Sequence, residues 1–211
     1  MSLLEDLRKS VIEGDQNSAQ DQVRQALTEN IPPERILTDG LISAMSEVGR
    51  MFEEGEFFVP EMLVSARAMK AGLAILRPSL AAANIRAIGK VVIGTVQGDL
   101  HDIGKNLIGM MLEGAGFEVI DLGVDVTPEK YVAAVQEHHP DLIGCSALLT
   151  TTMPRMQDII LALQAAGLRN TVKVMIGGAP VTEQYAREIG ADFYAPDAAS
   201  AAQGARKLLL A

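Results

Sequence analysis

The sequence predicts two regions of different fold class, an all-α region over residues 1–84 and an α/β region over residues 90–211. Two observations lead to this division. Up to about residue 84 the apolar residues recur every three or four positions, which is the spacing of amphipathic helices. From residue 90 onward, short runs of β-branched residues alternate with helical stretches, which is typical of a parallel sheet covered on both faces.

Four amphipathic stretches predict a small antiparallel four-helix bundle in the first region. Their apolar stripes include Leu7, Val23, Leu41 and Met69. The third stretch follows Pro32-Pro33-Glu34, whose prolines suit a helix start and whose acid suits the positive end of the helix. The connection over residues 53–60 is unusual for a turn, because it carries the apolar run Phe57-Phe58-Val59.

The second region predicts a flavodoxin-like (Rossmann-like) five-stranded parallel sheet. The expected strands are Val91–Val96, Glu118–Leu122, Leu142–Ala147, Val172–Ile176 and Asp192–Tyr194. The expected helices cover about 103–115, 128–138, 153–166, 181–189 and 198–210. Strands alternating with helices at this spacing indicate βαβ units. The alanine-rich segment from Pro78 to Gly89 is the expected linker between the two regions.

Charge and composition exclude several classes of function. The chain has 18 Lys and Arg against 27 Asp and Glu, a net charge of −9, with no basic block in either half. It therefore lacks the basic surface with which proteins bind nucleic acid or an anionic membrane. Cys145 is the single cysteine, so no intrachain disulfide can form, and the sequence begins with no basic, apolar leader. These features predict a reduced, cytoplasmic protein.

The unusual residues of the second region follow the predicted strands. In a doubly wound sheet, ligands bind beyond the carboxyl ends of the strands, next to the point where the strand order reverses. For the order 2-1-3-4-5, the first and third strands flank that point. The segments expected there are Gln97–Asn106, Ser146–Thr152 and Gly177–Pro180.

Asp99-x-His101 is the candidate ligand pair at this edge. A carboxylate two residues from a histidine can accept a hydrogen bond from one imidazole nitrogen and leave the other free to bind a metal. The alternative interpretation is a capped helix start with a solvated histidine, and the pair alone does not decide between the two.

Two other ligand classes lose support here. The segment after the first strand holds neither Gly-x-Gly-x-x-Gly nor Gly-x4-Gly-Lys-Ser/Thr, so a dinucleotide site and a P-loop are not predicted. A phospho-receiver domain needs a phosphorylated aspartate after the third strand, where this sequence has Ser146 and Thr150.

Taken together, Asp99-x-His101-x-x-Gly104, Ser146-x-Leu148 and Gly177-Gly178 resemble the three-part signature of the cobalamin-binding domains of the methyl-transfer class. The chain resembles a corrinoid protein of the methanol, methylamine or betaine methyltransferase systems. It is also similar to the cobalamin module of cobalamin-dependent methionine synthase. The resemblance covers essentially the whole chain, including the helical region.

The resemblance implies a role for each matching residue. His101 is the expected lower axial ligand of cobalt, Asp99 accepts its other ring N–H, and Thr152 stands where a serine extends this hydrogen-bond chain. Gly104 is expected to make room beside the nucleotide tail of the cofactor, and Gly177-Gly178 to let the tail end pass. The implied cofactor-binding residues are Asp99, His101, Asp102, Ile103, Gly104, Ser146, Leu148, Thr150, Thr152, Gly177 and Gly178.

The stretch from Val48 to Leu63 resembles the cap that this family places over the upper face of the cofactor. By this resemblance Phe52, Val59, Met62 and Leu63 shield the methyl group. The alternative is that these side chains only fill the bundle core, which is more plausible for Met62 and Leu63 than for the aromatic turn.

The resemblance implies a methyl carrier that is not catalytic alone, in one-carbon metabolism. The bound cofactor would alternate between cob(I)alamin and methylcob(III)alamin. The implied partners are a substrate-specific methyltransferase, a second methyltransferase whose acceptor is tetrahydrofolate or a similar compound, and a reductive activase. Neither the methyl donor nor the oligomeric state follows from the sequence. The alternatives are a cobalamin-binding sensor and the cobalamin-binding subunit of a radical isomerase.

Overall fold

The computed structural model describes residues 2–210. These residues form two compact units. The helical unit runs to Ala87, with the short stretch Glu113–Gly116 grouped with it, and the α/β unit comprises Ile88–Leu112 and the chain from Phe117 onward.

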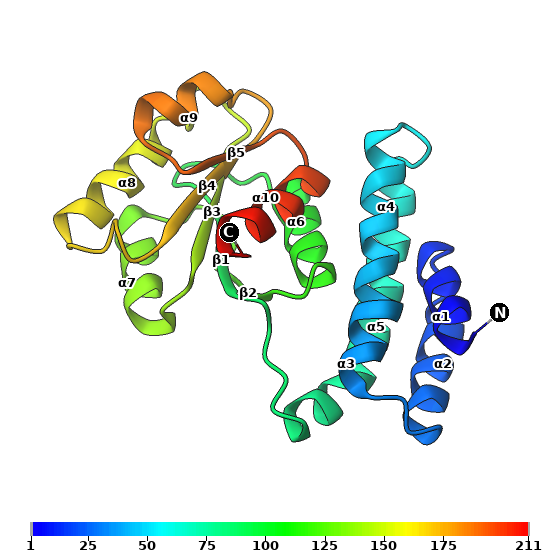
Figure 1. Cartoon of the computed structure of the whole chain (residues 1–211). Coiled ribbons are helices and arrows are strands. Elements are labelled where there is room, and N and C mark those ends of the chain that lie inside the picture. The colour runs from blue at the N-terminus through cyan, green and yellow to red at the C-terminus, as the bar shows by residue number, and fades with distance from the viewer. Residues whose placement is uncertain (1, 211) are drawn as a thin grey trace. The chain divides into compact units, whose positions relative to one another are not determined.

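Helices with well-formed ends build the helical unit (Figure 1). They are α1 (Leu3–Ile12), α2 (Gln16–Thr28), α3 (Pro33–Arg35), η1 (Ile36–Ile42), α4 (Ser43–Glu53) and α5 (Val59–Ala82). The Ser2 hydroxyl accepts the Glu5 N–H while the Glu5 carboxylate accepts the Ser2 N–H, which satisfies backbone donors at the start of α1. The Asp15 carboxylate accepts the Ser18 N–H at the start of α2 in the same way.

The third predicted helix is one continuous coil that changes its winding. After the single turn of α3, the residues Ile36–Ile42 form a π-helix, and α4 resumes the α-helical winding at Ser43. Gly40 lies in the π-helical segment, and a Cβ there would come within 2.7 Å of Leu7 Cδ2. A glycine therefore permits this close approach to α1.

The observed end of helix α5 differs from the prediction, which placed the start of the linker at Pro78. It continues through Pro78 and ends at Ala82, so the irregular segment before the α/β unit begins at Ala83 instead of Pro78. A proline inside a helix removes one backbone hydrogen bond. Here Leu76 and Leu80, on either side of Pro78, are both buried, and this apolar burial holds the last turns in helical form.

The α/β unit has the predicted doubly wound sheet, with strand order β2-β1-β3-β4-β5 and every pairing parallel. Its strands are β1 (Lys90–Thr95), β2 (Glu118–Asp121), β3 (Leu142–Ser146), β4 (Lys173–Gly177) and β5 (Phe193–Ala195). Its helices are α6 (Ile103–Gly114), α7 (Pro128–His138), α8 (Arg155–Ala165), α9 (Glu183–Ile189) and α10 (Ala198–Leu210). Helices α6 and α10 cover one face, and α7 and α8 cover the other (Figure 1). The predicted fold class is therefore confirmed.

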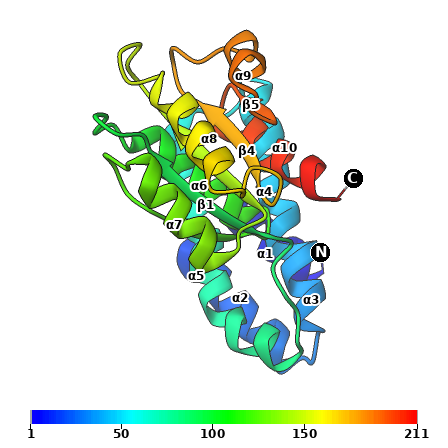
Figure 2. The same ribbon diagram turned by 90° about the vertical axis from the view of Figure 1, so that its left-hand side faces the viewer.

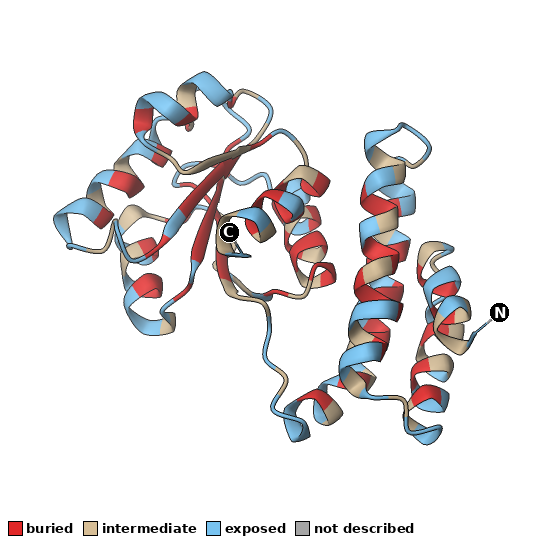
Figure 3. Cartoon of the chain, in the orientation of Figure 1, coloured by how far each residue is buried: buried red, intermediate tan, exposed pale blue. Residues whose placement is uncertain are grey.

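The central strands are buried along almost their whole length, whereas the outer surfaces of the covering helices are exposed (Figure 3). Tyr131 of α7 is fully buried, and its hydroxyl donates to the Gly94 carbonyl oxygen at 2.7 Å. This bond satisfies a polar group inside an otherwise apolar layer.

The connections that follow β1 and β3 leave the same end of the sheet (Figure 2). This end carries the residues that the sequence singles out. Within residues 2–210, no helix combines the length and the hydrophobicity that a bilayer span requires.

Candidate functional site

Asp99 and His101 lie side by side in the loop between β1 and α6. The Asp99 Oδ1 atom is 2.7 Å from His101 Nδ1 and also accepts the His101 backbone N–H at 3.1 Å. The side chain of Asp99 is fully buried, whereas that of His101 is 50% exposed. The carboxylate therefore holds the imidazole from the protein side and leaves the ring open to a ligand.

The second oxygen of Asp99 is bound by the loop that follows β3. Asp99 Oδ2 accepts the Leu148 N–H at 2.8 Å and the Thr152 hydroxyl at 2.7 Å. Burial by itself would raise the pKa of this carboxyl group. The hydrogen bonds that it accepts, above all the one from Thr152, outweigh burial, so the pKa of Asp99 lies well below its ordinary value.

The hydroxyl of Thr152 therefore completes a chain Thr152–Asp99–His101. Thr152 is almost fully buried, so its hydroxyl needs a partner inside the protein. Because Asp99 is ionised, it accepts the proton of His101 Nδ1, and the lone pair of the neutral ring lies on Nε2. No protein group within residues 2–210 hydrogen-bonds that Nε2 atom.

Large apolar side chains are exposed in the two loops that meet at Asp99. The side chains that flank His101 or follow β3 are large, apolar and open to solvent: Leu100 is 71% exposed, Ile103 76%, Leu148 45% and Leu149 42%. Several large apolar side chains exposed in neighbouring loops are typical of a binding surface.

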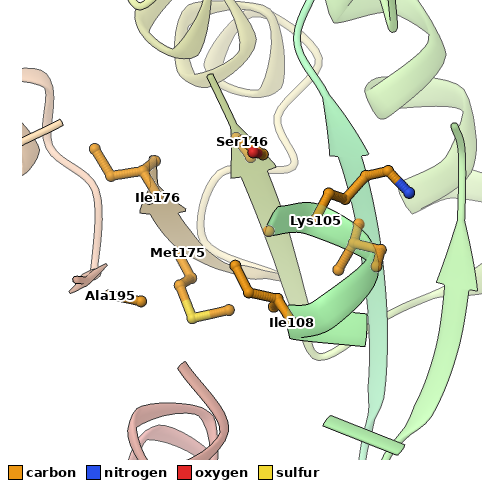
Figure 4. Close-up of a pocket in the computed structure, with 10 residues that line it drawn as sticks. Lys105, Ile108, Ser146, Met175, Ile176 and Ala195 are labelled. Carbon is orange, nitrogen blue, oxygen red and sulfur yellow. The ribbon is translucent and has the colours of Figure 1, made fainter. Parts of the chain in front are cut away.

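A pocket lies between helix α6 and the face of the sheet that this helix covers, next to β3 and β4 (Figure 4). Ile108 of α6 faces Met175 of β4 across it, and Ser146 lies at its edge. Its lining is almost entirely apolar. The free volume is about 20 Å³, room for roughly one water molecule. The flexible ends of Ile108 and Met175 must therefore move apart to admit a ring system.

The three glycines of the signature differ in their surroundings. A Cβ on Gly104 would meet nothing within 4 Å, so this position is open on the ligand side. A Cβ on Gly177 would lie 2.7 Å from the Ala195 carbonyl oxygen, and one on Gly178 would overlap the Ala147 carbonyl oxygen. Gly178 also has φ +132°. The close packing of the sheet therefore requires Gly177 and Gly178 whether or not a ligand is present.

Two other predicted site residues, Asp102 and Thr150, lie at the same edge of the sheet but do not contact Asp99 through a hydrogen bond. The Asp102 carboxylate accepts the Asn106 side-chain N–H at 3.0 Å, which braces the first turn of α6. Thr150 is exposed in the loop after β3.

The four predicted cap residues of the helical unit differ in exposure. Val59 is 37% exposed, and Phe52 and Leu63 are half-buried. Met62 is fully buried. Its side chain therefore packs as a core residue in this structure, in line with the alternative raised for it from the sequence.

Sequence reasoning missed three residues around the His101 loop. Thr95 is fully buried at the end of β1, and its hydroxyl donates to the His101 carbonyl oxygen at 2.9 Å. Lys105 is almost fully buried, and its ammonium group binds the carboxylate of Asp121. Asp125, in the connection between β2 and α7, accepts the Gly98 N–H at 2.7 Å. Thr95 could have been noticed in the sequence, because it is a polar residue at the end of an otherwise apolar strand.

Comparisons with known proteins identify the family of the chain. A family model described as "B12 binding domain" matches residues 89–203, and a second model with the same description matches residues 3–77. A corrinoid protein of Desulfitobacterium hafniense (strain Y51) is 43% identical over 212 residues, covering 99% of this chain and 98% of its own.

Two further relatives come from Methanosarcina species. Dimethylamine corrinoid protein 3 of Methanosarcina acetivorans is 43% identical over 208 residues, covering 99% of this chain and 97% of its own. Among solved structures, the methanol:cobalamin methyltransferase complex from Methanosarcina barkeri contains a chain that is 30% identical, with a TM-score of 0.88. That match covers 99% of this chain and 80% of the other.

Proposed function

The chain belongs to the B12-binding corrinoid proteins, and from that membership we propose that it carries a methyl group on bound cobalamin from one methyltransferase to another. The observation that carries the proposal is the Thr152–Asp99–His101 chain, which ends in a solvent-facing imidazole nitrogen with no protein partner among the described residues. The resemblance seen in the sequence and the expected cofactor are confirmed by this membership.

The residues present fit a corrinoid. A neutral imidazole held through Nδ1 is a good ligand for a transition metal. The exposed leucines and Ile103 offer apolar contacts to a macrocycle, and the pocket beside Ser146 offers an apolar lining for a heterocyclic tail. A Cβ on Gly104 would meet no atom within 4 Å, so this position leaves space for a ligand.

Each residue of the chain has a separate task in this proposal. His101 would hold the cobalt of a corrinoid through Nε2. Asp99 keeps the proton on Nδ1 and balances the positive charge that the ring acquires when it donates to a metal. Thr152 and the Leu148 N–H keep Asp99 ionised and hold its carboxylate in place beside His101.

When bound, a corrinoid supplies a cobalt ion that can accept a methyl group from one compound and pass it to another. The protein contributes the lower ligand, the orientation of the ring and the exclusion of water from the faces it covers. For Phe52, Val59 and Leu63, a shielding role over the upper face rests on the resemblance. Cytoplasmic location likewise stays a prediction from the sequence.

The proposed partners follow from the relatives. One relative is part of a methanol:cobalamin methyltransferase complex, and others are named for dimethylamine. We therefore propose a methyltransferase specific for methanol or a methylamine as the donor-side partner, and a second methyltransferase on the acceptor side. A reductive activase that restores oxidised cobalt completes the proposed set.

The lower ligand is tested by exchanging His101. The protein is loaded with cob(II)alamin, and its EPR spectrum is recorded for the wild type, His101→Ala and the control His138→Ala. His138 is the last residue of α7 and lies outside the site. We expect nitrogen hyperfine splitting from the lower ligand in the wild type and the control, and its loss in His101→Ala. An unchanged spectrum in His101→Ala would exclude His101 as the ligand.

The carrier role is tested with the loaded, reduced protein. It is incubated with methanol, methylamines, glycine betaine or aryl methyl ethers, with and without candidate methyltransferases, and methylation of the corrinoid is followed by absorption. We expect methylation only when a donor-specific methyltransferase is present. Rapid methylation by the protein alone would make the chain an enzyme in its own right. Loaded protein that no methyltransferase can methylate would favour the sensor or isomerase alternatives.

A further inference from the structure

The connection between β2 and α7 holds the loop that carries Asp99 and His101. Its backbone pairs with the end of β1, since Thr95 N–H donates to the Gly123 carbonyl oxygen at 3.0 Å and Val126 N–H donates to the Thr95 carbonyl oxygen at 2.9 Å. Val96 and Val126 form an isolated parallel bridge. The segment 122–126 therefore extends the sheet beyond β2, beside the start of the His101 loop.

Asp125 makes two further bonds from this connection. Its Oδ1 atom accepts the Gly98 N–H at 2.7 Å, and its own N–H donates to the Asp99 carbonyl oxygen at 3.1 Å. The two bonds hold the turn over Gly98 and Asp99 from one side. One binds the Gly98 N–H, and the other binds the Asp99 carbonyl oxygen.

The backbone of Asp125 is arranged for this task. Its φ is +53°, in the left-handed region that, apart from glycine, aspartate and asparagine tolerate best. A strained conformation persists where neighbouring interactions enforce it, and such residues cluster at functional sites. The two hydrogen bonds to the Gly98–Asp99 turn are the interactions that hold Asp125 in place.

Together these contacts form a second layer around the ligand residue. His101 is held by Asp99 and Thr95, and the Gly98–Asp99 turn is held by Asp125. The side chain of Asp125 does not contact the imidazole in this arrangement. It acts on His101 only through the position of the turn.

We propose that Asp125 is a positioning residue that sets how strongly His101 binds the cobalt, by fixing the Gly98–Asp99 turn from the neighbouring connection. The proposal rests on His101 being the lower ligand. When the Asp125 carboxylate is lost, the turn gains freedom, and the Asp99–His101 pair presents Nε2 in the binding orientation for a smaller fraction of the time.

Three substitutions separate the effects of the hydrogen-bond acceptor, the backbone strain and the negative charge of Asp125. Asp125→Ala removes the acceptor for Gly98 N–H and keeps the strain of positive φ. Asp125→Gly removes the acceptor and relieves the strain. Asp125→Asn keeps an oxygen acceptor and tolerates the left-handed conformation but removes the negative charge. A role in positioning predicts that Ala and Gly behave alike and that Asn behaves like the wild type.

The first readout uses the cofactor-free protein. Amide hydrogen exchange of Gly98 reports the bond to Asp125 directly, with no cobalt present. We expect exchange in Asp125→Ala and Asp125→Gly to be faster by about threefold to tenfold, the range for one hydrogen bond of ordinary net strength, and near the wild-type rate in Asp125→Asn. Unchanged exchange in Ala and Gly would overturn the proposal.

The second readout is the midpoint potential of the Co(II)/Co(I) couple in the loaded protein. Cobalt(I) takes no lower ligand, so weaker binding of His101 to Co(II) raises the potential. A threefold to tenfold loss of His101 binding corresponds to a rise of about 28 to 59 mV for one electron. We expect this rise in Asp125→Ala and Asp125→Gly, with Asp125→Asn at the wild-type potential.

The other possible outcomes show whether the role of Asp125 or the assignment of His101 as the ligand is wrong. A rise in all three variants, Asn included, would mean that the lost charge matters and the hydrogen bond does not, which overturns the proposal. Wild-type potentials in Ala and Gly, together with a large rise in His101→Ala, would overturn the role of Asp125 and leave His101 as the ligand. An unchanged potential in His101→Ala would overturn the ligand assignment itself.

Discussion

Replacing Thr152 by valine should destabilise the α/β unit even without cofactor. Valine keeps the branched shape of threonine and removes only the hydroxyl group. In the structure this hydroxyl donates to Asp99 Oδ2 at 2.7 Å and is also 3.0 Å from the Leu149 carbonyl oxygen. Since it carries a single proton, the bond to the charged carboxylate is the one that the substitution removes.

The partners of Asp99 set the size of the effect. A buried hydrogen bond to a charged group contributes about 1.5–3 kcal/mol to stability. After the substitution, Asp99 Oδ2 still accepts the Leu148 N–H at 2.8 Å and, more weakly, the Leu149 N–H at 3.4 Å. The carboxylate is not left unpaired, so we expect the lower part of the range, about 1.5–2 kcal/mol.

Urea unfolding of the cofactor-free protein, followed by circular dichroism, measures this loss. Thr152→Ser is the matched control, because serine keeps the hydroxyl and should stay near the wild type. A double-mutant cycle with Asp99→Asn isolates the pair, and the cost of Thr152→Val should shrink when the acceptor carries no charge. Equal stability of Thr152→Val and the wild type, or the same cost in the presence of Asp99→Asn, would refute the reasoning.

Three further predictions concern neighbouring parts of the α/β unit. Because the folded-state pKa of Asp99 lies below its unfolded value, its carboxylate stabilises the fold at neutral pH and this contribution is lost as the pH falls below about 5. Asp99→Asn should therefore flatten the acid side of a plot of unfolding free energy against pH, and an unchanged slope would count against this. Gly178→Ala should cost at least about 2 kcal/mol from strain and overlap with the Ala147 carbonyl, whereas Gly104→Ala should leave the cofactor-free protein as stable as the wild type. Tyr131→Phe should cost about 1 kcal/mol, because the Gly94 carbonyl oxygen loses its buried donor, and thermal unfolding would detect it.

The order of the elements followed from local pattern. The change from a helical period to short β-branched runs near residue 90 predicted both fold classes, and the predicted strands agree with the observed ones to within one or two residues. The spacing of apolar residues is a local property of the chain, so it can be read without knowledge of the tertiary contacts. The π-helical segment Ile36–Ile42 and the continuation of α5 through Pro78 were not predicted, because packing against neighbouring helices determines them.

The same distinction separates the residues of the site. Asp99 and His101 are two positions apart, so their hydrogen bond could be expected from the sequence alone. Gly177 and Gly178 were correctly placed at the edge of the sheet, but only the structure shows that the backbone carbonyls of Ala195 and Ala147 already require them.

The sequence by itself determined the two fold classes, the edge of the sheet that carries the candidate site, and the Asp99–His101 pair that lies there. Tertiary structure alone decided what holds that pair in place. The bond from Thr152 to Asp99 spans 53 residues and the bond from Gly98 to Asp125 spans 27, so no local pattern contains them. Parallel strands bring the loops that follow them to one end of the sheet, and only there do these side chains come within hydrogen-bonding distance.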